Sequence, residues 1–303
     1  MRKTADTGGR RLLKDVTLIA GPTASGKSAR ALELARKTGA VIVNTDSMQV
    51  YGILSILTAH PGSDELAAAP HRLYGHVHPG RSYSTGDWLR DVAALTEAEN
   101  LNQKPVIFVG GTGLYFRALT EGLSPMPDVP KAIRAHWRNQ LAAEGAESLH
   151  SLLKDIDPVS AARIRPSDGQ RIVRALEVME ASGKPISQWQ AEPSQPLVDT
   201  AAAKKIVLEP DRKELARRID ERFDRMLEIG ALEEVAALLR LNLSPSMPAM
   251  KAIGVRELSA ALSGQISLKE AAARAKAATR QYAKRQMTWF RHQIGPDWQR
   301  LRD

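Results

Sequence analysis

An eight-residue segment near the start of the chain constrains its fold more than any other feature. Residues 21–28 read GPTASGKS and match the full pattern G-x-x-x-x-G-K-[ST] of a phosphate-binding loop. The segment follows the aliphatic run VTLIA and opens a stretch of helical pattern, which is the context that the motif requires. A random chain of this length would match by chance about once in a hundred. The sequence therefore predicts a P-loop between a strand and a helix.

The P-loop residues are expected to bind a diphosphate or a triphosphate. Backbone N–H groups wrap the phosphates, and the helix N-terminus adds a favourable potential. Lys27 would place its charge on the terminal phosphate, and Ser28 could hold Mg²⁺. After the run VIFV the chain has Gly110, Gly111 and Thr112, where many NTPases have a metal-ordering aspartate, which weakens an ATPase interpretation. The predicted phosphate-binding residues are Gly21, Pro22, Thr23, Ala24, Ser25, Gly26, Lys27 and Ser28.

Aliphatic runs and helical patterns alternate through the first third of the chain. Strands are expected at VTLIA, AVIVNTD and PVIFV, and the run IVLE at 206–209 is expected to be one more. This alternation predicts a parallel sheet with crossover helices. Residues 131–190 have a helical pattern between two proline-bearing stretches. We therefore expect an α/β, P-loop NTPase-like core at 14–122 and 201–303, an all-helical insertion at 123–200, C-terminal helices, and a flexible tail at 1–13.

Composition narrows the class of protein. Hydrophobic residues make up 43% and charged residues 25%, which are ordinary values for a soluble globular protein. The aliphatic runs are too short to span a bilayer, and the basic N-terminus lacks the apolar region of a secretory signal. The chain has no cysteine, which excludes disulfides and thiolate chemistry. We expect a cytoplasmic enzyme that is monomeric and does not bind membranes.

Positive charge is concentrated at the C-terminus. The formal net charge is +9, and eight basic residues stand against two acidic ones in residues 271–303. Lys276, Arg280 and Lys284 recur every four residues, so a helix would place them on one face. Such a face is typical of a surface that follows nucleic-acid phosphates, and a solvated helix face is the alternative.

The second predicted strand ends in Asp46, which is a candidate catalytic residue. A carboxylate at the carboxyl end of a strand beside a P-loop lies where such sheets bind their ligands. From its position alone, Asp46 could act as a general base, a metal ligand or a helix cap.

Eight segments resemble the tRNA dimethylallyltransferase family, also called tRNA isopentenyltransferases. They occur in the family's order and read GPTASGKS, DSMQVY, PHRLYGHV, YSTGDWL, VGGTGLYFRALTEGL, DGQRIVRALEV, KAIGVREL and TRQYAKRQMTWFR. The resemblance implies a P-loop core with a helical insertion that grips the anticodon stem-loop of tRNA. It also implies dimethylallyl diphosphate as donor, Mg²⁺ as metal, and N6 of the adenosine 3′-adjacent to the anticodon as acceptor, with diphosphate released.

The same resemblance assigns roles to individual residues. Asp46 resembles the family's general base, and Thr112 resembles a residue at the reaction channel. Arg222 resembles an arginine that reaches the diphosphate beside Lys27. The tRNA-binding residues implied are Asp46, Ser47, Met48, Gln49, Thr112, Arg134, Gln170, Arg171, Ile172, Val173, Arg174, Lys251, Ala252, Ile253, Gly254, Val255, Arg256, Arg280, Lys284 and Arg285. Structural ion pairs are the alternative for the arginines.

One stretch departs from the family's pattern. After Tyr51 the family has roughly K/R-G-x-x-I-G-T-A-K-P, whereas this chain has GILSILTAHP, so Gly52, Ile53 and His60 differ. Contacts from this loop cannot be transferred. Three other interpretations stay open: an adenylate isopentenyltransferase, a P-loop kinase and an RNA-binding NTPase. The helical insertion and its arginines favour tRNA over a free nucleotide, and the kinase leaves the basic C-terminal helix unexplained.

Overall fold

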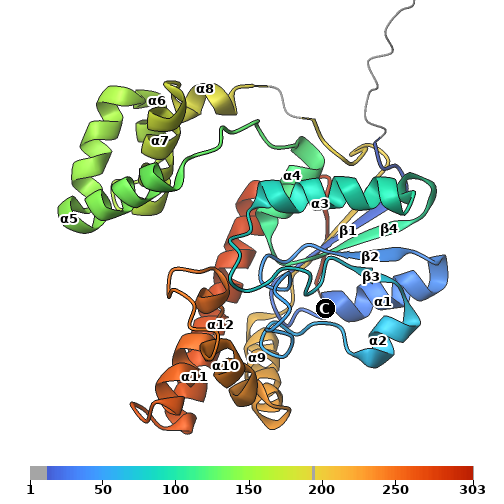
Figure 1. Ribbon diagram of the computed structural model, residues 1–303. Helices are drawn as coiled ribbons and strands as arrows, with labels where there is room; N and C mark the ends of the chain where they lie inside the picture. Colours follow the sequence, from blue (N-terminus) through green and yellow to red (C-terminus); the bar gives the residue numbers. More distant parts are fainter. Residues whose placement is uncertain (1–11, 193–194, 303) are drawn as a thin grey trace, which may run out of the picture. The chain divides into compact units, whose positions relative to one another are not determined.

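The computed structural model describes residues 12–192 and 195–302 (Figure 1). The chain divides into two compact units. One unit contains the described residues up to Thr120 and from Pro196 onward, and the other is Glu121–Gln195. The sequence-based expectation for the insertion was 123–200. We describe each unit by itself.

The first unit is built on a six-stranded sheet. Its order is β3-β2-β4-β1-β5-β6, and every neighbouring pair is parallel. The predicted α/β class with a P-loop NTPase-like sheet is confirmed. The two outermost strands were not predicted, because they are very short and lack an aliphatic run. The strands are β1 (Val16–Ala20), β2 (Val41–Asn44), β3 (His71–Arg72), β4 (Val106–Gly110), β5 (Lys204–Leu208) and β6 (Gln299–Leu301).

Successive side chains of a strand point to opposite faces of the sheet. Because both faces here are apolar, helices cover both of them. Ile19 and Ile107 pack with alanines of α1 (Lys27–Thr38) on one face. Leu18 and Phe108 pack on the other face with side chains of α3 (Thr85–Ala98) and α4 (Gly113–Glu121). Burial on both faces explains why these strands read as continuous aliphatic runs.

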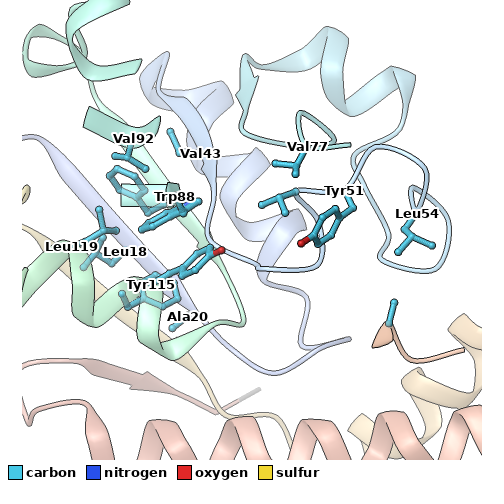
Figure 2. Close-up of a cluster of buried hydrophobic side chains, with 14 of the residues drawn as sticks. Leu18, Ala20, Val43, Tyr51, Leu54, Val77, Trp88, Val92, Tyr115 and Leu119 are labelled. Carbon is cyan, nitrogen blue, oxygen red and sulfur yellow. The ribbon is translucent and has the colours of Figure 1, made fainter. Parts of the chain in front are cut away.

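Trp88 of α3 connects this core to the loop after β2. Its ring is fully buried and stacks on Tyr115 with ring centroids 4.2 Å apart. Figure 2 shows the two rings among Leu18, Val92 and other side chains of the core. The indole Nε1 donates to Asn44 O at 3.0 Å, at the end of β2. The core therefore fixes the point from which the Asp46 loop leaves the sheet.

Between β5 and β6 the chain of this unit forms helices. Asp211 caps the first, accepting from Lys213 N and Glu214 N. The buried face of this helix includes Phe223 and Met226, and Leu227 is partly buried. The remaining elements are α2 (Ser63–Ala68), η1 (Leu101–Gln103), α9 (Arg212–Glu228), α10 (Ala231–Leu239), η2 (Ala249–Lys251), α11 (Val255–Leu262) and α12 (Leu268–Gln293).

The second unit has a hydrophobic core of its own, formed mainly by α5 and α7. Its described residues contain helices and no strand, as the sequence predicted. Gly145 interrupts α5 with φ 82° and ψ 168°, so α5 is two helical segments joined by a kink. The elements are α5 (Lys131–Ile156), α6 (Pro158–Arg163), α7 (Gly169–Ser182) and α8 (Ile186–Gln190).

The start of the chain differs in part from the expected tail at 1–13. Residues 1–11 lie outside the described part of the structure. Leu13, however, is 2% exposed, and its N–H donates to Leu197 O at 2.9 Å. Its carbonyl accepts from Asp199 N at 2.8 Å, so this residue belongs to the folded core. Over the described ranges, no helix has the length and apolar character needed to cross a membrane.

Candidate functional site

The predicted P-loop has the backbone expected of a phosphate cradle. It connects β1 to α1, and Gly26, directly before the helix, has φ 84°, which favours glycine. Ala24 also has a positive φ, of 62°. No side chain caps α1, so the N–H groups of its first turn are available to an anion. The loop can therefore bind phosphate groups as the sequence predicts.

Lys27 lies at the start of α1, with its ammonium group held back toward the loop. Its Nζ donates to Pro22 O at 3.1 Å. Burial lowers the pKa of Lys27 from 10.5 to about 8, against an opposing effect of the Asp46 carboxylate, and the Arg222 guanidinium lowers it further. A partly buried ammonium that is poorly compensated by the protein favours binding of an anion.

Asp46 follows β2 and is held by a tight turn. Its N–H donates to Asn44 Oδ1 at 2.8 Å, and its Oδ1 accepts from Met48 N at 3.0 Å. Asn44 is fully buried, and its Nδ2 donates to Asp46 O at 2.9 Å. These bonds engage one carboxylate oxygen, whereas Oδ2 has no hydrogen bond to any described residue. No helix begins here, so Asp46 shapes a turn and presents one free oxygen.

Thr112 joins the Asp46 loop to the end of β4. Its Oγ1 accepts from Ser47 N at 2.9 Å and donates to Ser47 Oγ at 3.3 Å. Its N–H donates to Thr45 O at 3.2 Å. The structure therefore places Thr112, which follows β4, against the Asp46 loop, which follows β2.

A pocket of about 350 Å³ lies between the P-loop and the helices α9 and α12. The P-loop and Asp46 loop provide its polar wall, and α9 provides much of its apolar wall. The lining residues are Thr23, Ala24, Asp46, Ser47, Met48, Leu57, Thr58, Ile219, Arg222, Phe223, Met226, Lys251, Ala252, Ile253, Thr279, Tyr282 and Arg285. One polar and one apolar wall suit a ligand with a charged group and a hydrocarbon or aromatic part.

Arg222 of α9 lines this pocket and is partly buried. Burial lowers the pKa of its guanidinium, and Asp46 opposes that effect. Arg222 has no ion pair or hydrogen bond with any described residue. Among the described residues, Asp46 is the carboxylate that acts on both Lys27 and Arg222, which leaves an excess of positive charge at a partly desolvated site. Such an excess is typical of a site for a multiply charged anion.

The expected RNA contacts divide into exposed and buried residues, and burial argues against side-chain contacts from several of them. Ile172 and Val173 are 0% and 6% exposed in the core of the helical unit, so their side chains cannot contact RNA. Val255 is 1% exposed in the core of the first unit, and Gly254 is also buried. Ala252 is likewise buried, although it borders the pocket.

The polar residues expected to contact RNA are largely exposed. Arg134 and Gln170 lie at the surface of the helical unit. Arg171 pairs with Asp168 at 3.2 Å and Arg174 pairs with Glu177 at 3.6 Å. The Arg171–Asp168 pair is exposed and contributes little to stability, so it can exchange for a phosphate contact at low cost, whereas the Arg174 partner Glu177 is buried. In the first unit Lys251 and Arg256 are exposed, and Ile253 lines the pocket with Lys251.

The predicted cationic face of α12 is partly neutralised. Lys276 pairs with Asp224 at 2.6 Å, and Arg280 pairs with Asp220. Both partners lie on α9, so these cations connect two helices of the same unit. Lys284 is exposed and has no ion pair with a described residue. Arg285 lines the pocket, with its guanidinium carbon 5.7 Å from the centre of the Tyr282 ring.

The divergent loop at 52–61 is held by two residues. Gln49 Nε2 donates to Thr58 O at 2.8 Å and Ala59 O at 2.7 Å, so its amide supports this loop. Glu234 of α10 is 9% exposed, and its carboxylate accepts from Ile56 N at 2.7 Å and Leu57 N at 2.9 Å. No local pattern pointed to Glu234, because its partners lie far away in the chain.

His60 in the same loop lies against Tyr74, with ring centroids 6.0 Å apart. Burial lowers its pKa, and its Nε2 is buried without a hydrogen bond to a described residue. These contacts indicate a packing role.

The donor set for a metal is limited. Within the described ranges, no group of three or more His, Cys, Asp or Glu residues converges as a metal site. Ser28, the expected ligand, is exposed at the start of α1. Mg²⁺ commonly keeps several water ligands and binds through one or two protein oxygens plus substrate phosphates. The residues present fit that mode of binding.

Comparison with known proteins places this architecture in a family. The model of the IPP transferase family matches residues 49–293. A tRNA dimethylallyltransferase from Chelativorans sp. (strain BNC1) is 68% identical over 96% of this chain and 99% of that protein. One from Rhizobium meliloti (strain 1021) is 55% identical over 95% of each chain.

Solved structures agree with the sequence comparison. The full-length tRNA isopentenylpyrophosphate transferase from Bacillus halodurans aligns with a TM-score of 0.67 and 30% identity, over 95% of this chain and 90% of that chain. A eukaryotic dimethylallyltransferase, described as acting on tRNA, aligns with a TM-score of 0.79 and 28% identity, over 95% of this chain and 74% of that chain. This chain therefore belongs to the IPP transferase family.

Proposed function

We propose that this protein transfers a dimethylallyl group from dimethylallyl diphosphate to N6 of the adenosine 3′-adjacent to the anticodon in tRNA, releasing diphosphate. Relatives of this chain over nearly its full length are tRNA dimethylallyltransferases. The observation that carries the proposal is the arrangement of charge at the pocket. Two partly buried cations, Lys27 at the start of α1 and Arg222 on the pocket wall, interact with one carboxylate, Asp46 of the pocket wall.

The cations and the P-loop bind the donor's diphosphate. The N–H groups at the start of α1 and the Lys27 ammonium contact its oxygens, and Arg222 contacts it from α9. As the bond between the allylic carbon and the diphosphate oxygen breaks, negative charge on the leaving group grows. N–H groups and cations that already point at the leaving diphosphate stabilise the transition state more than the ground state, because the charge they contact is larger there.

Asp46 prepares the acceptor. The exocyclic amine of adenine is a weak nucleophile because its lone pair is delocalised into the ring. The nitrogen lone pair forms the new C–N bond. The free Asp46 Oδ2 accepts the amine proton, and the electron pair of the broken N–H bond becomes the lone pair of the product nitrogen. Thr112 fixes the Asp46 loop through Ser47. Chemistry on a stacked base requires its extrusion, and the pocket beside Met48 and Tyr282 offers apolar surface for it.

Mg²⁺ is part of the proposal. When bound, it would supply positive charge to the departing diphosphate, held by Ser28 Oγ, diphosphate oxygens and water. The loop could also accept the phosphates of ATP, since its pattern does not distinguish phosphate donors.

The tRNA is bound by exposed cations and polar groups on both units. We assign phosphate contacts to Arg134, Gln170, Arg171 and Arg174 on the helical unit. On the first unit we assign them to Lys251, Arg256, Lys284 and Arg285. A cytoplasmic monomer is the form in which we expect the enzyme to act.

Transfer of label from donor to tRNA tests the proposal. The protein is incubated with labelled dimethylallyl diphosphate and unmodified tRNA, and the tRNA is digested to nucleosides. Label on N6 of one adenosine is expected. Label transferred to AMP instead would indicate an adenylate isopentenyltransferase, and phosphoryl transfer from ATP would indicate a kinase. ATP hydrolysis stimulated by RNA without label transfer would indicate an RNA-binding NTPase.

An Asp46→Asn variant tests the assignment of the base. The amide cannot accept the amine proton, so kcat should fall by ~10²–10⁴-fold while donor affinity changes little. Asp64→Asn, at an exposed residue of α2, is the matched control. A loss of donor binding with normal residual turnover would instead identify Asp46 as a metal ligand.

A further inference from the structure

Gln286 of α12 connects two loops of the active site through one side chain. Its Oε1 accepts from Thr23 N in the P-loop at 2.9 Å. Its Nε2 donates to Gly111 O, directly after β4, at 2.9 Å. The side chain is 5% exposed, so both bonds are shielded from water. A primary amide is the side-chain group that can donate at one end and accept at the other in this geometry.

The approach of Gln286 to the second loop depends on glycine at position 111. A Cβ atom there would lie 2.1 Å from Gln286 Nε2, which is far inside van der Waals contact. The same atom would lie 3.3 Å from Asp46 Oδ2. The Gln286 amide and the free Asp46 oxygen therefore both border Gly111, with Thr112 next in the chain.

We propose that Gln286 is a positioning residue that sets the separation between the phosphate-binding loop and the Asp46–Thr112 pair. This inference rests on the proposed function, because the two loops then hold the donor's diphosphate and the acceptor's amine. The reacting carbon and nitrogen must approach within about 3–3.5 Å, and a displacement of about 1 Å can cost ~10²-fold in rate. Gln286 contacts neither substrate, so its loss affects their alignment more than the binding of either one.

Gln286→Met is the first test, because methionine has nearly the same length and cannot form either hydrogen bond. We expect kcat to fall by ~10–10²-fold, with KM for dimethylallyl diphosphate and for tRNA within about threefold of the wild type. Gln281→Met is the matched control, since Gln281 is an exposed residue of the same helix. A wild-type kcat in Gln286→Met, or a raised KM for one substrate at unchanged kcat, overturns the proposal.

Gln286→Glu adds a readout that a packing role would not change. The ionised carboxylate can accept from Thr23 N but repels Gly111 O, whereas the protonated acid can satisfy both loops. Burial raises the pKa of a carboxyl group, so protonation is accessible at mildly acidic pH. The ratio of variant to wild-type kcat should therefore rise as pH falls. A ratio that is independent of pH contradicts the hydrogen-bond role.

Gly111→Ala approaches the same contact from the other loop. The added methyl group must displace the Gln286 amide, so the loss of kcat should resemble that of Gln286→Met. The double variant should be little worse than either single variant, because both remove the same connection. Additive losses would show that the two positions act separately, and would overturn the proposal.

Hydrogen exchange separates failure of this inference from failure of the proposed function. Wild-type transfer of label decides the function independently. Whatever that result, removing the acceptor should speed exchange of the Thr23 amide in Gln286→Met and not in Gln281→Met. Equal exchange in the two variants overturns the connection even if the wild type is active, and faster exchange in Gln286→Met supports it even if no transfer is found.

Discussion

Replacing Lys27 by methionine should stabilise the ligand-free protein while removing its donor site. A lysine with a pKa lowered from 10.5 to about 8 on folding is held in an unfavourable charged state at neutral pH. Each pH unit of difference corresponds to ~1.4 kcal/mol, so the cost is about 3.5 kcal/mol. Methionine avoids that cost but loses the hydrogen bond to Pro22 O, which offsets ~1 kcal/mol. We expect a net gain of about 2–3 kcal/mol in the free energy of unfolding.

The pH dependence distinguishes charge from packing as the cause. Because the pKa is lower in the folded state, the cost of Lys27 is fully present below about pH 8. Between about pH 8 and pH 10.5 the Lys27 amine is protonated in the unfolded chain and neutral in the folded protein. The free energy of unfolding therefore rises with pH in this range, and the cost of Lys27 decreases. The advantage of Lys27→Met should therefore be largest near neutral pH and small near pH 10. Urea unfolding at both pH values measures it, with the exposed Lys104→Met as control.

Two results would refute this reasoning. Destabilisation by Lys27→Met near neutral pH would mean that the ammonium is well compensated in the folded protein. A gain of equal size at both pH values would mean that the methionine simply packs better.

Calorimetry offers a second check, because an anion raises the pKa of a neighbouring ammonium. Inorganic diphosphate should thus bind the wild type near pH 8 with uptake of protons, and the variant should lack that uptake.

Two further predictions concern the divergent loop and the cations of α12. Glu234→Ala should lower the free energy of unfolding by about 1–3 kcal/mol, because two backbone N–H groups of that loop lose their acceptor. Urea unfolding measures this loss, with Glu233→Ala at an exposed position as the control. Equal stability of the two variants would contradict the prediction. Replacing Lys284 and Arg285 together should flatten the slope of log K against log[salt] for tRNA binding by about 0.7–0.9 for each phosphate that the variant no longer neutralises. Lys276→Ala should change that slope less, because its ammonium pairs with Asp224, and an equal change would show that this pair opens for RNA.

Local sequence signals predicted the central part of the fold well. The P-loop pattern and the three aliphatic runs identify β1, β2 and β4, because these strands are buried on both faces. β3 and β6 were missed, since they have two and three residues at the edges of the sheet and are only partly buried. Pairing at an edge depends on the neighbouring strand, which sequence pattern alone does not reveal.

The buried residues among the expected RNA contacts have one physical origin, which is that each sequence motif covers both the inward and the outward face of its helix. In a helix, consecutive side chains point about 100° apart, so a block of five residues always includes inward positions. Ile172 and Val173 occupy such positions between the surface residues Arg171 and Arg174. Applying helical periodicity to the segment QRIVR would have separated the core residues from the candidate RNA contacts.

Long-range partners account for the rest of what the sequence could not reveal. The carboxylates that pair with Lys276 and Arg280 lie on α9, more than fifty residues earlier in the chain. Gln286 is 263 residues from Thr23 and 175 from Gly111, and nothing local distinguishes it from the exposed Gln281. Only the fold, by packing α12 against the P-loop, gives one glutamine a role and leaves the other at the surface.

Three adjacent residues of α12 show how one helix can serve separate tasks. Lys284 is exposed, Arg285 lines the pocket, and Gln286 is buried between the two loops. Because each residue turns the side chain by about 100°, three successive positions reach three different environments. A basic stretch in the sequence therefore does not define a single RNA-binding face. Substitutions at these positions should separate by assay: salt dependence of tRNA binding at 284, both binding and turnover at 285, and turnover alone at 286.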